Sequence, residues 1–98
     1  MEKLVRDRIP EIIEEDRGEA SPFRVASPGE YHQLLALKLR EEVGEYLSDR
    51  EPLELADILE VVYALAKDAG LTPEKLEKMR RRKAEERGGF SERKVMNF

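Results

Sequence analysis

The chain has 98 residues, no cysteine, 41% charged residues and a formal net charge of −4. This length argues for a single domain over 1–98 with a thin core, since a chain of this size buries only about 60–65% of its unfolded surface. The composition excludes disulfides and thiolate zinc sites, and the acidity argues against nucleic acid as a partner. No apolar signal stretch opens the chain, and its longest apolar run, 61–66, is far below the roughly 20 residues of a membrane span. We therefore expect a cytoplasmic protein with no membrane partner.

The N-terminal part predicts one short helix followed by a connection. Pro10 suits the first position of a helix, so we expect a helix over 10–16. The glycines and prolines of 17–29 predict irregular chain, in which 23–25 is a candidate extended piece.

The middle of the chain predicts two helices joined by a tight turn. Ser27 and Glu30 form a capping-box pattern, which predicts a helix from 28 to about 47. A turn at 48–51 leads to a second helix over 52–70, with a glycine as its C-terminal cap. Apolar side chains nearly encircle this second helix, which is typical of a helix buried by a neighbouring subunit.

The C-terminal part predicts one more helix and a tail. Thr72 is the expected cap of this helix, Gly88 its expected end, and 90–98 a short extended tail. We therefore expect an all-α fold, a helical bundle built on a central antiparallel helix hairpin. A homodimer or a higher homo-oligomer would complete its core.

Two pairs of carboxylates flank the central turn. Glu42 and Glu45 stand three residues apart before it, and Glu54 and Asp57 stand three apart after it. Residues three apart share a helix face, so antiparallel helices would bring position 42 to 57 and 45 to 54. Two unit charges about 4 Å apart repel by about 4 kcal/mol at an effective dielectric near 20. Four acids on otherwise apolar faces would thus be strongly unfavourable, or protonated, without a cation.

A hard divalent cation fits this set of ligands. Carboxylate oxygens suit Mg²⁺, with Mn²⁺ as the second candidate. The alternative is structural ion pairing, for which Lys38, one turn before Glu42, is the nearest partner; Lys38 could equally face a phosphate. Because Mg²⁺ in proteins commonly bridges substrate phosphates, the acids indicate phosphoanhydride chemistry.

A triphosphate would have to be held by side chains, because the sequence has no Walker-type glycine loop. Lys83 and Arg87 are candidate phosphate contacts, since they stand one helical turn apart beside a glycine turn and an aromatic residue. The alternative is that these cations simply stabilise the C-terminus of a helix.

Together these patterns resemble a known family. The EExxE…ExxD signature of the MazG-like all-α nucleoside triphosphate pyrophosphohydrolases resembles Glu41-Glu42-Val43-Gly44-Glu45 followed by Glu54-Leu55-Ala56-Asp57. The small phosphoribosyl-ATP pyrophosphohydrolase-like branch is similar in two further elements, Lys3-Leu-Val-Arg-Asp-Arg-Ile-Pro10 and Lys83-x-x-x-Arg87-Gly-Gly-Phe90. The gap between the two acidic motifs is shorter than in many relatives, which implies a tighter hairpin.

The resemblance implies a Mg²⁺-dependent enzyme that cleaves a nucleoside triphosphate, or a related nucleotide, to the monophosphate and pyrophosphate. Nucleotide-pool house-cleaning is one role that would fit. Glu41 would accept a proton or support the ligands. The residues that would bind Mg²⁺ are Glu42, Glu45, Glu54 and Asp57, and those that would contact the substrate are Lys38, Lys83, Arg87, Lys3 and Arg6.

Two other functions stay open from the sequence. A helical oligomerisation module could bind metal and nucleotide without turnover. A small nucleic-acid binder could use the arginines of 80–82, although the net acidity of the chain speaks against it.

Overall fold

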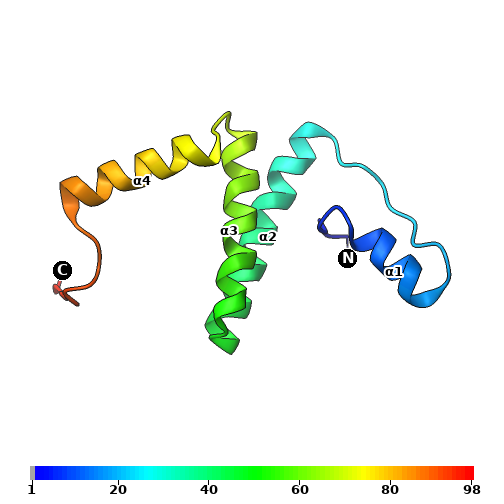
Figure 1. Ribbon diagram of the computed structural model, residues 1–98, viewed down its shortest axis with the longest axis horizontal. Helices are drawn as coiled ribbons and strands as arrows, with labels where there is room; N and C mark the ends of the chain where they lie inside the picture. Colours follow the sequence, from blue (N-terminus) through cyan, green and yellow to red (C-terminus); the bar gives the residue numbers. More distant parts are fainter. Residues whose placement is uncertain (1) are drawn as a thin grey trace.

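The computed structural model describes residues 2–98, in which four α-helices form and no β-strand occurs (Figure 1). The predicted all-α fold is therefore confirmed. The helices, in chain order, are α1 (Ile9–Arg17), α2 (Pro28–Asp49), α3 (Pro52–Asp68) and α4 (Pro73–Arg87). The candidate extended piece at 23–25 lies outside the helices and forms no β-strand.

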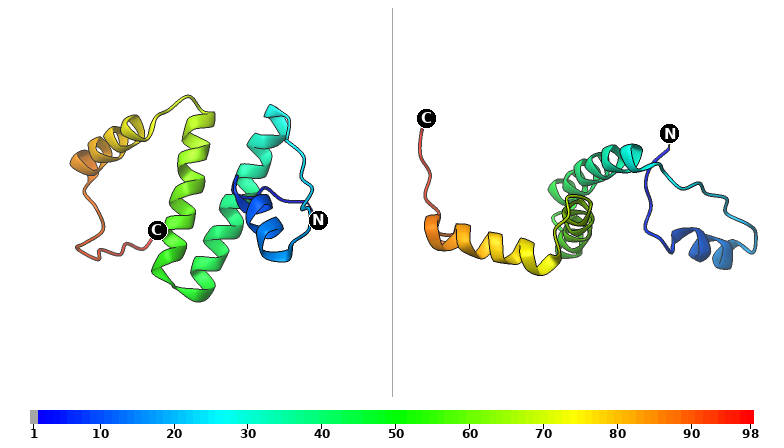
Figure 2. Two further views of the ribbon diagram at one scale, coloured as in Figure 1. Left: turned by 45° about the vertical axis from the view of Figure 1, so that its right-hand side comes forward. Right: turned by 90° about the horizontal axis from the view of Figure 1, so that it is seen from above.

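Helices α2 and α3 form the antiparallel hairpin that the sequence predicts, and they are the pair in closest contact. They lie side by side in both views of Figure 2, with α1 on one side of the pair and α4 projecting from the other. Both predicted side-chain caps form. The Ser27 hydroxyl accepts from the Glu30 N–H at 3.4 Å, and the Thr72 hydroxyl accepts from the Lys75 N–H at 3.1 Å.

Gly70 ends α3 in the way expected of a C-terminal glycine. Its φ of +83° is left-handed, and its N–H donates to the Lys67 carbonyl at 2.9 Å. The next N–H, that of Leu71, donates to the Ala66 carbonyl at 2.8 Å. These two bonds satisfy carbonyls that the end of a helix otherwise leaves unpaired.

The turn between α2 and α3 is shorter than predicted. The prediction of a four-residue turn at 48–51 was wrong, because α2 continues to Asp49 and only Arg50 and Glu51 connect the helices. Arg50 adopts a left-handed φ of 57°, and its own Nε donates to the Leu47 carbonyl at 3.0 Å. Because the left-handed residue at this helix end is not a glycine, the sequence offers no sign of the extra half turn.

The chain buries few of its apolar side chains. Its radius of gyration is 17.2 Å, against about 13 Å for a compact domain of 100 residues. Only Leu35, Val61 and Ala66 are buried apolar residues among 2–98. The outer face of α3 is exposed instead, and its exposed residues are Leu53, Leu55, Leu59 and Tyr63. An extended chain with this much exposed apolar surface is suited to packing against a partner or another copy of itself.

The residues before α1 are fixed to the rest of the chain by ion pairs. Arg24, in the connection, bridges Glu2 at 3.0 Å and Glu30 at 2.6 Å. These two carboxylates raise the pKa of the Arg24 guanidinium, which therefore stays charged. Within the described part of the chain, α1 makes no close contact with another helix. The N-terminal segment, residues 2–8, is thus connected to the rest of the chain by ion pairs.

None of the helices within 2–98 is both long enough and apolar enough to cross a membrane.

Candidate metal centre

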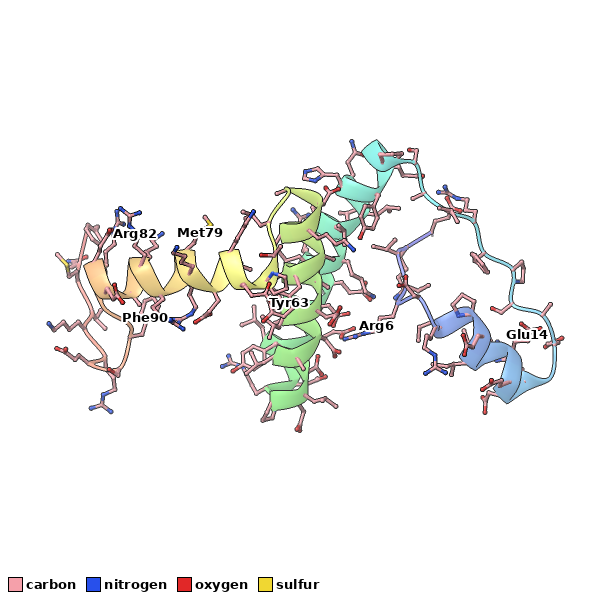
Figure 3. All side chains as sticks on the ribbon, turned by 45° about the horizontal axis from the view of Figure 1, so that its top comes forward. Arg6, Glu14, Tyr63, Met79, Arg82 and Phe90 are labelled. Carbon is pink, nitrogen blue, oxygen red and sulfur yellow. The ribbon has the colours of Figure 1, made fainter. Side chains whose placement is uncertain are left out.

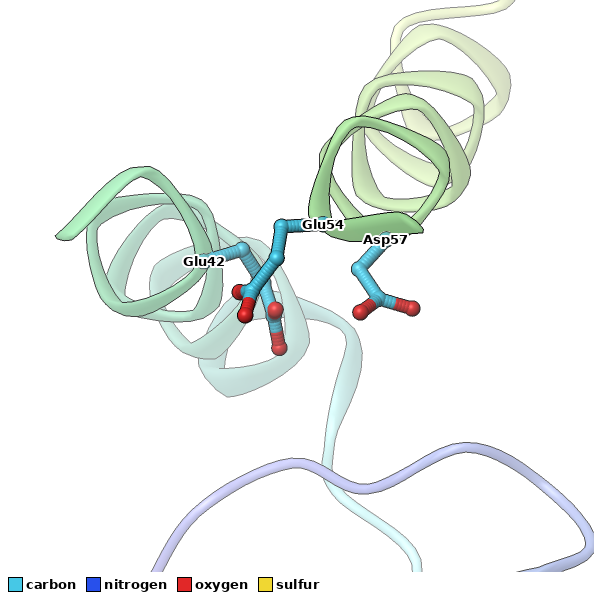
Figure 4. A group of neighbouring side chains, drawn as sticks. All are labelled: Glu42, Glu54 and Asp57. Carbon is cyan, nitrogen blue, oxygen red and sulfur yellow. The ribbon is translucent and has the colours of Figure 1, made fainter. Parts of the chain in front are cut away.

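Three of the predicted carboxylates meet near the turn between the two central helices. Glu42 comes from α2, and Glu54 and Asp57 come from α3. One oxygen from each lies within 4.8 Å of the others, a spacing that could hold one metal ion. Figure 4 shows the three side chains pointing to the same side of the helix pair. We call these three residues the acidic cluster.

Burial makes the acidic cluster different from a group of surface acids. Glu42 is only 8% exposed. Two of the cluster's oxygens, Glu42 Oε2 and Glu54 Oε2, are buried and have no hydrogen-bond partner. Buried polar atoms are normally paired, so each unpaired one needs a reason, such as a bound ion. Two unpaired carboxylate oxygens within one site are the acceptors that a hard cation would satisfy.

The charges at the site repel one another as the sequence predicts. The pKa of Glu54 is raised to about 7, first by desolvation and then by the neighbouring carboxylates of Asp49, Glu45 and Asp57. The pKa of Glu45 is also raised, chiefly by the negative charge of Glu42. At neutral pH the negative charge of these carboxylates is therefore not fully balanced by the groups around them.

Glu45 and Asp49 extend the acidic cluster along α2. Glu45 is close enough to Glu42 for the charge of Glu42 to raise its pKa, but it is not among the three residues whose oxygens converge. Asp49 is an acid that the sequence argument missed, and its carboxylate helps to raise the pKa of Glu54. The signal for Asp49 was its position four residues after Glu45, on the same helix face. Ending α2 too early hid that signal.

Three of the cationic side chains predicted to contact the substrate form ion pairs with acids at this site. Lys38 Nζ is 3.4 Å from both Glu41 Oε2 and Glu42 Oε1. Lys3 Nζ is 2.9 Å from Glu41 Oε1, and this contact does most to lower the pKa of Glu41.

The third of these cations comes from the same N-terminal segment. Arg6 Nη2 is 2.8 Å from Asp57 Oδ1. Figure 3 shows the Arg6 side chain reaching from that segment towards the helix pair.

These ion pairs do not replace a metal ion at the acidic cluster. The Arg6–Asp57 pair is exposed on both sides, and such pairs contribute only about 0–1 kcal/mol. Lys38 contacts Oε1 of Glu42 and leaves the buried Oε2 without a partner. Structural ion pairing thus explains part of the charge at the site but not its two unpaired oxygens. The residues present fit a divalent cation.

Lys83 and Arg87 do not join the acidic cluster within one chain. Both lie in the second half of α4, which leaves α3 at the end remote from the α2–α3 turn (Figure 1). In Figure 3 the labelled neighbours Arg82 and Phe90 lie at the far end of this arm, away from Arg6. Their assignment as substrate contacts stays a prediction.

Comparison of the chain with known protein families, with curated proteins and with solved structures finds no match. The function must therefore be argued from the site itself.

Proposed function

We propose that this protein is a Mg²⁺-dependent nucleotide pyrophosphohydrolase of the MazG-like kind that its acidic motifs resemble. It would cleave a nucleoside triphosphate, or a related nucleotide, to the monophosphate and pyrophosphate. The observation that carries the proposal is the pair of buried, unpaired oxygens of Glu42 and Glu54 within a convergent group of carboxylates. An oxygen-only site of this kind suits Mg²⁺, with Mn²⁺ as a substitute.

The roles of the acids follow from their surroundings. Glu42, Glu54 and Asp57 would hold the ion, and Glu45, one helical turn after Glu42 on α2, would complete the set. Mg²⁺, when bound, supplies charge neutralisation for the phosphates and a water of lowered pKa. Glu41 is held ionised by Lys3, so it is available as a proton acceptor at neutral pH.

The cations have a second role once a polyphosphate is present. Arg6, Lys3 and Lys38 now neutralise site carboxylates, and each could turn to a phosphate oxygen when the ion takes over that task. Lys83 and Arg87 would reach a site only in an assembled oligomer, as contributions from another copy. The exposed apolar face of α3 supports a homodimer or a higher homo-oligomer.

The test is a panel of canonical and modified nucleoside triphosphates with Mg²⁺, in which pyrophosphate and orthophosphate are measured separately. We expect pyrophosphate as the first product. Glu42→Gln and Asp57→Asn should abolish its release while the far-ultraviolet circular dichroism stays helical. Glu85→Gln, which removes an exposed acid from α4, is the matched control and should leave activity unchanged.

Three results would count against the proposal. Orthophosphate as the first product would place the cleavage elsewhere on the chain of phosphates. Full activity of both cluster variants would show that Glu42 and Asp57 are not metal ligands. Saturable nucleotide binding that depends on Mg²⁺ but yields no product from any nucleotide would instead establish the non-catalytic binding module.

A further inference from the structure

A cavity of about 430 Å³ lies between the N-terminal segment, α1 and the central helix pair. Glu42 and Asp57 form part of its wall, so the cavity opens directly onto the acidic cluster. Sites for small organic ligands commonly have volumes of about 300–1,000 Å³. The space beside the acidic cluster is therefore large enough for a ligand that extends away from the metal centre.

Most of the cavity wall is apolar and includes one aromatic ring. Tyr31 and the buried Leu35 contribute from α2. Val5 and Ile9 contribute from the opposite side, where the chain enters α1. A flat heterocycle suits such a wall, because an aromatic ring can stack on it and aliphatic side chains can contact its other face.

Three cations line the cavity; Arg8 pairs with Glu11, and the other two stand at the boundary with the acidic cluster. Arg6 and Lys38 both line the cavity, and each is paired with a cluster acid, Asp57 and Glu42 respectively. Along α2 the wall therefore changes from Tyr31 and Leu35 to Lys38 and then to Glu42. A ligand that matches this order has an apolar ring at one end and an anionic chain at the other.

We propose that this cavity is the nucleoside-binding site of the protein. The base stacks on Tyr31 between the aliphatic groups, and the phosphate chain runs past Arg6 and Lys38 to the acidic cluster. The N-terminal segment is then a wall of the binding site. This inference rests on the proposed function, since it takes the ligand of the acidic cluster to be a nucleotide.

The test compares ligands that share the phosphate chain and differ in the base. The probes are the α,β-methylene analogues of ATP, GTP, CTP and UTP, with inorganic tripolyphosphate as the probe without a base. Binding to the full chain is measured by isothermal titration calorimetry with Mn²⁺. We expect at least one analogue to bind tenfold or more tightly than tripolyphosphate.

Two variants test whether the preference for a ligand with a base arises in this cavity. Tyr31→Leu keeps the apolar volume and removes the aromatic ring, so the tenfold advantage of the base should disappear while Mn²⁺ and tripolyphosphate bind as before. Val5→Trp fills the cavity from its other wall and should have the same effect. Tyr46→Leu makes the same substitution on α2 outside the cavity and should change nothing.

The inference is overturned if no analogue binds better than tripolyphosphate, or if Tyr31→Leu and Val5→Trp retain the preference for the base. A change of oligomeric state in both variants, without a change in base preference, would show that the cavity is a subunit contact. Pyrophosphate release with an unchanged KM in Tyr31→Leu would remove the cavity proposal and leave the proposed function intact. Base-dependent binding without any pyrophosphate release would refute the proposed function and leave the cavity proposal intact.

Discussion

Arg6 and a divalent cation compete for the same carboxylate. The guanidinium Nη2 of Arg6 is 2.8 Å from Asp57 Oδ1, and Asp57 is one of the three residues that would hold the ion. Binding of the ion must therefore loosen the ion pair. Arg6→Gln removes the competing charge, and we expect it to raise the affinity of the protein for Mn²⁺ while lowering its affinity for a nucleotide triphosphate.

The size of the effect follows from the exposure of the pair. The side chains are 54% and 38% exposed, and exposed pairs contribute about 0.2–1 kcal/mol. Loss of that competing free energy corresponds to a gain in Mn²⁺ affinity of about 1.4-fold to fivefold. A buried pair would give a much larger change, so a small gain is itself part of the prediction.

The assay is a titration with Mn²⁺ followed by electron paramagnetic resonance of the free ion. Arg8→Gln is the matched control, since Arg8 belongs to the same segment but pairs with Glu11 at 2.9 Å. Both variants change the net charge equally, so any general attraction of cations to a more acidic protein appears in both. Equal affinities in the two variants, or weaker binding in Arg6→Gln, would refute the competition for Asp57.

Three further predictions concern stability and assembly. The pKa of Glu54 is about 7 in the folded protein against an ordinary 4.5, so between these values the folded state binds more protons than the unfolded state. The unfolding free energy of the metal-free protein should therefore fall as the pH rises from about 4.5 to about 7, and urea titrations of Glu54→Gln should show a shallower fall, because Glu45 keeps a raised pKa; a rise over that range would contradict the assignment. Leu35→Ala should cost about 2–5 kcal/mol in the same titrations, because Leu35 is 2% exposed, whereas Leu37→Ala on the exposed side of α2 should cost far less. Leu59→Lys, on the exposed face of α3, should reduce the mass measured by sedimentation equilibrium, and an unchanged oligomer would place the interface elsewhere.

The helices could be predicted because their boundaries are set by neighbours in the sequence. Ser27 and Thr72 cap the N–H groups three residues later, and Gly70 supplies the left-handed residue that ends α3. The turn was predicted less well, because Arg50 takes a left-handed conformation that is unusual for an arginine. That one error placed Asp49 in a turn, whereas the structure places it on α2, beside the acidic cluster.

The convergence of the acids was predictable in part. The three-residue spacing placed each couplet on one helix face, and the antiparallel hairpin brought Glu42 to Glu54 and Asp57. The spacing did not reveal that Glu45 stays outside the convergent group. This depends on how the two helices are rotated about their axes, which is set by side-chain packing along their whole length.

The sequence by itself determined the all-α fold, the central hairpin and the acidic faces, because these depend on contacts within one or two helical turns. Only the tertiary structure decided which cations meet the acids. Arg6 lies 51 residues from Asp57 along the chain, and Lys3 lies 38 from Glu41. The cavity beside the acidic cluster has walls from the N-terminal segment and both central helices. Such contacts depend on the path of the connection between α1 and α2, which no local pattern of residues fixes.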